Sequence, residues 1–163
     1  MLKHLKRAAL YWHTIKYLRP EQLFARIKFR LAKPKVDVRP APALRDAKGP
    51  WTTPPARMAS MVAPTTFVFL GEYGTLDEDG WDNPERSKLW RYNQHYFDDL
   101  NAQQAAERHE WHAALITRWI KENPAPTGSG WEPYPLSLRI VNWVKWHRAQ
   151  NPLSTEALDS LAI

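Results

Sequence analysis

The chain has 163 residues, of which 44% are hydrophobic and 25% are charged, a composition typical of globular proteins and not of disordered ones. It contains no cysteine, which excludes disulfide bonds, thiolate metal sites and a cysteine nucleophile. The formal net charge of +6 is uneven: residues 1–48 hold 13 Lys and Arg against 3 Asp and Glu, whereas residues 49–163 hold 10 against 14. A basic amino-terminal segment therefore precedes a mildly acidic remainder.

The first 33 residues are predicted to form a basic amphipathic helical arm. One helix is expected over residues 2–18 and a second from Pro20 to a point before Pro34, because proline disfavours helix at the residue before it. The arm either docks on the rest of the protein or lies on an anionic membrane surface. No nucleic-acid-binding motif is present, so nucleic acid is not an expected partner. The apolar residues that set the first helix are Leu2, Leu5, Ala9, Trp12 and Ile15.

The amino terminus does not predict export or membrane insertion. No apolar run approaches the roughly 18 residues that a bilayer-spanning helix needs. The first 20 residues also lack the uninterrupted apolar segment and the small-residue cleavage site of a signal peptide. A cytoplasmic location is therefore expected.

Residues 34–64 are predicted to form a linker or a strap, because they contain seven prolines and no helical periodicity. The next segment, Thr65 to Leu70, is β-branched and aromatic and predicts one short strand or hairpin. Turns are expected at Tyr73-Gly74 and at Asp79-Gly80.

From Leu89 onward the apolar spacing predicts helices over about 107–122 and from about Pro135 to Gln150, followed by a last helix capped by Ser154. Residues 136–146 are apolar almost all round, which predicts a helix that is buried on several sides. The apolar pattern of the last helix is still running at Ile163, so we expect 65–163 to be the beginning of a larger domain.

Two segments combine aromatic rings with polar groups. On the helix after Pro135, spacings of three and four residues place Arg139, Asn142, Trp143 and Trp146 on one face. Either Arg139 pairs with Glu132 or a carbonyl group while Asn142 caps a loop, or these side chains form the wall of a ligand site. The second segment, residues 89–98 (LWRYNQHYFD), fits a polar network in the core or the rim of a cleft equally well.

His109 and His112 are predicted to be surface histidines and not metal ligands, because their spacing differs from that of the zinc-protease motif and no third ligand is apparent. No metal and no cofactor is expected.

Residues 89–98, followed by residues 130–143 (GWEPYPLSLRIVNW), resemble the amino-terminal part of the heparinase II/III-like family. The arm fits as well, with His13-Thr14 and the segment 18–22 (LRPEQ), so the resemblance covers essentially the whole chain. Two positions depart from the family pattern: Gln94 stands where Leu is usual, and Leu136 where Thr is usual.

The resemblance implies a mainly α fold: a partial (α/α) toroid of antiparallel helices, which in the family precedes a large β-sandwich domain. It also implies a polysaccharide lyase that removes the C5 proton of a uronic acid and eliminates the 4-linked sugar. The catalytic Asn, Tyr and His of the family lie in segments of the type Gly-Asn-His and Met-Tyr-His, and neither occurs in these 163 residues. Family analogy adds the periplasm as a second location.

We therefore expect an amino-terminal fragment of a polysaccharide lyase, inactive alone, whose partners are an acidic polysaccharide and the missing carboxyl-terminal part of the parent protein. The alternatives are a stand-alone module that binds acidic carbohydrate or acts as a scaffold, and a membrane-surface binder that acts through the arm. The residues expected to contact the glycan are Trp131, Glu132, Tyr134, Arg139, Asn142, Trp143, Tyr92, Asn93 and His95.

Overall fold

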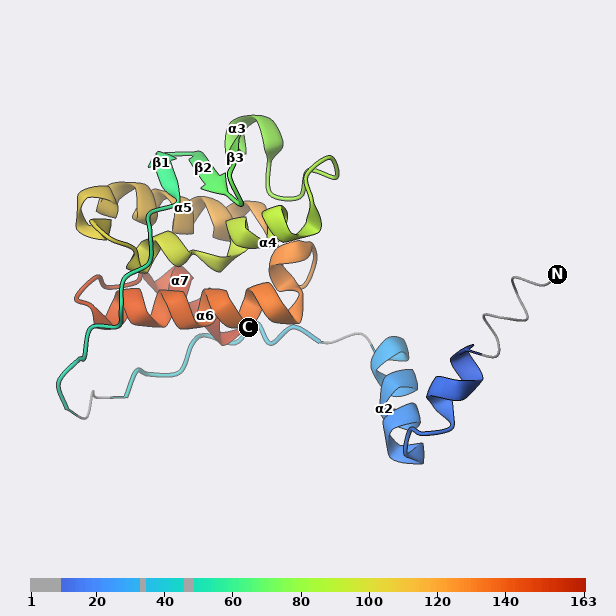
Figure 1. The fold of residues 1–163 in the computed structure, drawn as a ribbon. Helices are drawn as coiled ribbons and strands as arrows, with labels where there is room; N and C mark the ends of the chain where they lie inside the picture. The colour runs from blue at the N-terminus through green and yellow to red at the C-terminus, as the bar shows by residue number, and fades with distance from the viewer. Residues whose placement is uncertain (1–9, 33–34, 46–48) are drawn as a thin grey trace. The chain divides into compact units, whose positions relative to one another are not determined.

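The computed structural model describes residues 10–32, 35–45 and 49–163, and the chain divides into two compact units, Met1–Lys35 and Val36–Ile163. The Pro-rich segment from residue 36 onward belongs to the second unit. Both units are drawn in Figure 1. None of the helices in the described ranges is long and apolar enough to cross a bilayer.

Over residues 10–32, the first unit shows two helices joined by a turn. Residues 10–15 are helical, and α2 (Pro20–Leu31) follows. Proline at the first helical position is favourable because that position needs no backbone N–H, and the Arg19 N–H is satisfied by the Gln22 side chain at 3.0 Å. The predicted helix over 2–18 ends earlier than expected, at residue 15, and its residues Leu2, Leu5 and Ala9 lie outside the described ranges.

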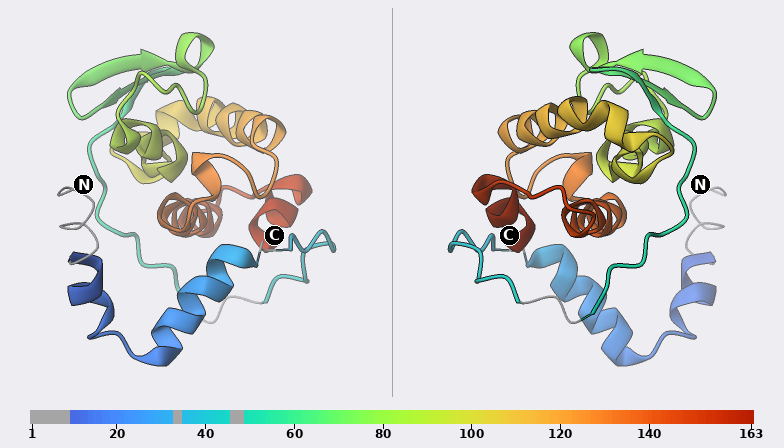
Figure 2. Two further views of the ribbon diagram at one scale, coloured as in Figure 1. Left: turned by 90° about the vertical axis from the view of Figure 1, so that its right-hand side faces the viewer. Right: turned by 90° about the vertical axis from the view of Figure 1, so that its left-hand side faces the viewer.

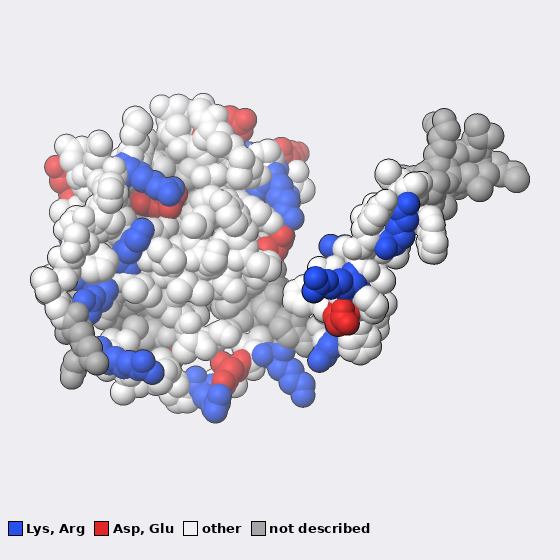
Figure 3. Space-filling view, turned by 60° about the horizontal axis from the view of Figure 1, so that its bottom comes forward, with Lys and Arg blue, Asp and Glu red and all other residues white. Residues whose placement is uncertain are grey.

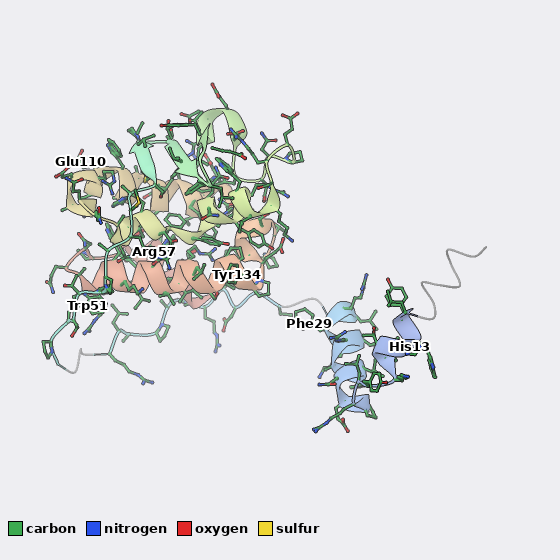
Figure 4. All side chains as sticks on the ribbon, viewed as in Figure 1. His13, Phe29, Trp51, Arg57, Glu110 and Tyr134 are labelled. Atoms are coloured by element: carbon green, nitrogen blue, oxygen red, sulfur yellow. The ribbon has the colours of Figure 1, made fainter. Side chains whose placement is uncertain are left out.

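In the second unit the Pro-rich segment is a strap, with no helix at residues 36–45 and 49–60, and hydrogen bonds join it to the helical body. The Ala41 N–H donates to Asp159 at 2.7 Å, and the Arg57 carbonyl accepts from the Gln103 N–H at 2.8 Å. The Arg57 side chain also pairs with Asp98 at 2.6 Å. Figure 4 shows Trp51 and Arg57 on this strap, beside the helical body.

A small antiparallel sheet follows the strap, with strand order β1 (Met61–Ala63), β2 (Thr66–Phe69), β3 (Glu72–Thr75). The short strand or hairpin expected from residues 65–70 is thus part of a three-stranded sheet, in which β2 is the middle strand. The prediction of a turn at Tyr73-Gly74 is wrong, because both residues are paired in β3. The turn is formed instead by Leu70 and Gly71, whose φ angles of 57° and 80° give the left-handed geometry that tight hairpins require.

The remainder of the second unit is helical, which agrees with the mainly α prediction. Within this unit the sheet lies on one side of α4 and α5, and α6 and α7 lie on the other (Figures 1 and 2). Ser87 and Ser154 accept hydrogen bonds from N–H groups in the first turns of α4 and α7, as N-cap residues do. The helices are α3 (Leu76–Asp79), α4 (Lys88–Tyr96), α5 (His109–Glu122), α6 (Pro133–Arg148) and α7 (Thr155–Ala162), with short 3-10 helices η1 (Asp98–Asn101), η2 (Ala105–Arg108) and η3 (Ser129–Trp131).

The core of this unit is built around three fully buried indole rings, those of Trp90, Trp119 and Trp143. Trp119 and Trp143 meet edge to face at 5.8 Å, a favourable geometry for aromatic pairs. One prediction about the core is wrong: α6 is buried along one side only, and Ile140, Val141 and Val144 are exposed.

Candidate functional site

The two segments that carry the family resemblance pack against each other in the second unit, because α4 contacts both η3 and α6. Asn142 on α6 makes the most direct connection. Its side-chain amide donates to the Tyr96 carbonyl at 2.8 Å and to the Asp98 carboxylate at 2.7 Å. The first of these bonds gives a partner to a backbone carbonyl at the end of α4, where Phe97 adopts a left-handed conformation and the helix stops. Of the two roles considered for Asn142, the structure therefore shows the capping one.

Arg139 lies one turn before Asn142 and is completely buried in a cage of tryptophan rings. Its guanidinium carbon is 3.7 Å from the ring centre of Trp119 and 4.7 Å from that of Trp131, distances typical of cation–π contacts. One nitrogen donates to the Gly130 carbonyl at 2.6 Å, whereas Nε and Nη2 have no partner among the described residues. Burial lowers the pKa of Arg139 to about 9, so the group is still a cation at neutral pH.

His95 on α4 borders the same cage and is also sealed from solvent. The indole N–H of Trp119 donates to its Nδ1 at 2.9 Å. Since an indole nitrogen is only a donor, Nδ1 must be the acceptor and the imidazole proton must lie on Nε2. Burial lowers the pKa of His95 to about 4, and this ring is therefore neutral at neutral pH.

Around the junction of α4 and α6, one group of solvent-accessible residues is joined by hydrogen bonds and ring contacts, and we call it the α4–α6 rim: Lys88, Tyr92, Glu132 and Tyr134. Lys88 Nζ is 2.9 Å from a Glu132 carboxylate oxygen, and the Tyr92 hydroxyl donates to the same oxygen. The hydrogen bonds from Lys88 and Tyr92 hold the pKa of Glu132 below its usual range, so Glu132 is a carboxylate at neutral pH. Contact with Glu132 in turn raises the pKa of Lys88.

Tyr134 provides the most exposed ring of the rim, with 59% of its surface open to solvent. The centre of its ring lies 6.5 Å from that of Tyr92 and 5.7 Å from that of the buried Tyr96, against which it packs edge to face. Figure 4 shows it at the amino-terminal end of α6. The rim thus combines an aromatic face with a cation, a carboxylate and two phenols, groups that bind sugar rings and their hydroxyl and carboxylate substituents.

The nine residues expected to contact a glycan therefore divide into two groups. His95, Arg139, Asn142 and Trp143 are buried, so the expectation that their side chains form an open cleft wall is not what the structure shows. They are buried because the aromatic rings of α4, α5 and α6 close over them, and Arg139 takes the carbonyl partner that sequence reasoning gave as the alternative. The other five are at least partly accessible: Tyr92, Asn93, Trp131, Glu132 and Tyr134.

Two of these five, Asn93 and Trp131, offer a ligand fewer free contacts than the rim residues do. The amide of Asn93 donates to the Leu89 carbonyl of its own helix at 2.8 Å, and the Trp131 ring packs on Trp119 at 5.5 Å. Lys88, in contrast, was not expected. Its position at the start of α4, close to Glu132, could not be inferred from its place in the sequence.

A polar cluster around Asp99 also escaped prediction. Asp99 accepts hydrogen bonds from the Ser60 N–H at 2.6 Å, the Met61 N–H at 3.0 Å, Arg108 at 2.8 Å and His112 at 2.8 Å. Burial alone would raise the pKa of Asp99, but these hydrogen bonds, led by that from His112, outweigh it and hold the pKa well below its usual range.

The prediction that His112 is a surface residue is wrong, since its ring is fully buried. His112 shares the buried side of α5 with Leu115, Ile116 and Trp119, and this helical spacing was a signal that sequence reasoning overlooked. Within the described ranges, no group of three or more His, Cys, Asp or Glu side chains is arranged to hold a metal ion.

No protein-family model, curated protein or solved structure matches the sequence, so the family resemblance rests on the sequence segments named above.

Proposed function

We propose that this chain is the amino-terminal part of a heparinase II/III-like polysaccharide lyase, in which α4 to α7 form the first helices of an incomplete (α/α) toroid. The observation that carries the proposal is the meeting of the two resembling segments at the junction of α4 and α6. These segments are some thirty residues apart in the sequence, and at this junction they contribute to one rim of aromatic and charged side chains.

The rim supplies groups suited to an acidic glycan. The exposed ring of Tyr134 can stack on a pyranose face, and Lys88 has N–H donors beyond the one that Glu132 uses. Glu132 does not attract a uronate carboxylate; it orients Lys88 and Tyr92 and neutralises part of the positive charge. The buried Arg139 and Asn142 act one layer below: Arg139 joins α6 to η3 and to Trp119 on α5, and Asn142 joins α6 to the end of α4.

Elimination from a uronic acid requires a base for the C5 proton and a group that neutralises the adjacent carboxylate. The family's Gly-Asn-His and Met-Tyr-His segments would supply these groups, and they do not occur in this sequence. We therefore expect this chain to bind the glycan without cleaving it.

The proposal is tested by calorimetric titration of the chain with oligosaccharides of heparan sulfate, hyaluronan and alginate, together with an assay for the ultraviolet absorbance of unsaturated uronate. Lys88→Gln should weaken binding, since it removes the rim's cation. Glu132→Gln should strengthen it, because it frees Lys88 and removes a repelling carboxylate.

The matched control is Lys121→Gln, which removes an exposed cation from α5 outside the rim. Equal effects of Lys88→Gln and Lys121→Gln would refute a site at the rim. Robust lyase turnover by this chain alone would refute the assignment of the catalytic groups to other segments.

A stand-alone carbohydrate-binding module is the second candidate, and the buried aromatic core of the second unit favours it. A cooperative thermal melt of the chain, with glycan binding of the same affinity as in any longer form, would support this module over a lyase fragment. Aggregation through the exposed apolar side of α6 would favour the fragment.

A further inference from the structure

The helix α2 in the first unit has an apolar side that is bordered by cations. Leu23, Ile27 and Leu31 follow one another at four-residue spacing and therefore line one side of the helix. Phe24 lies next to this row by the same geometry. Lys28 borders it on one side and Arg30 on the other, whereas Phe29 falls on the opposite side of the helix.

This apolar side is open to solvent. No residue of α2 is buried, and Ile27 retains 58% of its surface exposed. The helical residues 10–15 add Leu10, Tyr11 and Trp12, which are all exposed. Contiguous apolar surface of this kind, on a helix with a charged border, is typical of an interaction surface and not of a solvated face.

The charge of the arm limits the kind of partner. The described residues 10–32 contain five Lys and Arg and one acidic residue, Glu21. Figure 3 shows Lys and Arg side chains on the visible face of the first unit. The partner must therefore be anionic and must also accept a row of aliphatic side chains.

We infer that the first unit binds the surface of an anionic lipid bilayer, with α2 lying in the plane of the interface. Leucine, isoleucine and phenylalanine enter the boundary between headgroups and acyl chains, while the flanking Lys and Arg extend their long side chains to lipid phosphates. Tyr11 and Trp12 belong to the residue types that favour this depth. A polyanion such as RNA would attract the cations but offers no apolar environment in which to bury the aliphatic row.

The helix lies on the bilayer and does not span it. Its 12 residues rise about 18 Å, which is well short of the roughly 30 Å of a hydrocarbon core. The inference is independent of the proposed glycan function, because it involves neither the α4–α6 rim nor any residue of the second unit.

The test is flotation of the full chain with vesicles of phosphatidylcholine, alone or mixed with phosphatidylglycerol. We expect binding to the mixed vesicles only, and weaker binding as salt is added. Replacing Lys28 and Arg30 with Glu should lower the partition coefficient by at least about fivefold for each lost cation.

A matched pair of variants separates membrane insertion from general stickiness. Ile27→Asp and Phe29→Asp place the same charge on the same helix, but on opposite sides of it. Ile27→Asp should abolish binding to the mixed vesicles and Phe29→Asp should retain it, although Phe29 is the more exposed residue at 80%. Lys88→Gln in the second unit should leave vesicle binding unchanged.

Three results would overturn the inference. The first is equal binding to both kinds of vesicle, or none to either. The second is an equal loss in Ile27→Asp and Phe29→Asp. The third is that RNA displaces the chain from vesicles and that Ile27→Asp binds RNA with the same affinity as the parent. That result would identify a binder of polyanions instead.

Discussion

Replacement of His95 should remove a large part of the acid sensitivity of the second unit. The pKa of this residue falls from 6.5 to about 4 on folding, chiefly because burial disfavours the charged ring and secondarily because Arg139 lies nearby, with Asp82 opposing both. As the pH drops below 6.5, the unfolded chain takes up a proton at His95 that the folded chain does not. Stability is therefore lost between about pH 6.5 and pH 4.

The size of the effect follows from the two pKa values. Between about pH 8 and pH 4.5 the unfolded state gains almost one proton at this position and the folded state only a fraction of one, which costs about 2.5 kcal/mol of unfolding free energy. Carboxylates with lowered pKa values contribute little in this range, because their share of the stability begins to be lost only near their unfolded pKa values of about 4 and disappears as the pH falls through the lower folded values.

The measurement is urea unfolding followed by tryptophan fluorescence at both pH values, for the parent chain and for His95→Asn. Asparagine can place its amide oxygen close to the position of Nδ1, so that Trp119 keeps an acceptor. The variant will be less stable at both pH values because it leaves a cavity, and the measurement at pH 8 gives that cost alone. The variant should then lose about 2.5 kcal/mol less than the parent on acidification; equal losses would refute the reasoning.

Two further predictions concern the packing of the same unit. Asp99→Asn leaves Arg108 buried without its ion pair and should lower the unfolding free energy by about 3–5 kcal/mol at neutral pH. The comparison is Arg57→Ala, which removes an exposed ion pair with Asp98 and should lower the unfolding free energy by less than about 1 kcal/mol in the same urea titration. Gly130→Ala should cost about 1–3 kcal/mol, because a Cβ there would lie 2.7 Å from the His95 ring and 2.9 Å from Trp119; a melting temperature equal to that of the parent would show that the cage yields easily.

Much of the helical body could be predicted from sequence because its signals are local. The N-cap at Ser154, the termination of α5 at Asn123-Pro124 and the shared side of Arg139, Asn142 and Trp143 all follow from spacing and capping rules. The outer strands of the sheet were missed since β1 and β3 are only three and four residues long and lack a β-branched run. The extent to which α6 is exposed could not be predicted either, because apolar residues on all sides of a helix do not reveal which sides have a neighbour.

The site was predicted less well, for a physical reason. Residue types such as Arg, Asn and His among tryptophans indicate either a ligand wall or a satisfied core, and only the positions of the neighbouring rings distinguish the two. Glu132 illustrates this point. Sequence proximity made it a candidate partner for Arg139, but in the structure it pairs with Lys88 and Tyr92, which precede it by 44 and 40 residues.

The division between buried and exposed motif residues has a consequence for how the motifs are interpreted. Arg139 bonds to Gly130 in η3, and Asn142 bonds to the end of α4, so these buried contacts fix the position of α6 against the two segments that it packs on. A ring such as Tyr134 can stack on a sugar only if the helices beneath it keep a constant separation, since a displacement of about 1 Å is enough to spoil a binding geometry. Under the proposed glycan function, sequence similarity across residues 130–143 is therefore expected even between proteins that bind different glycans, whereas differences in specificity should lie in the exposed residues Lys88, Tyr92 and Tyr134.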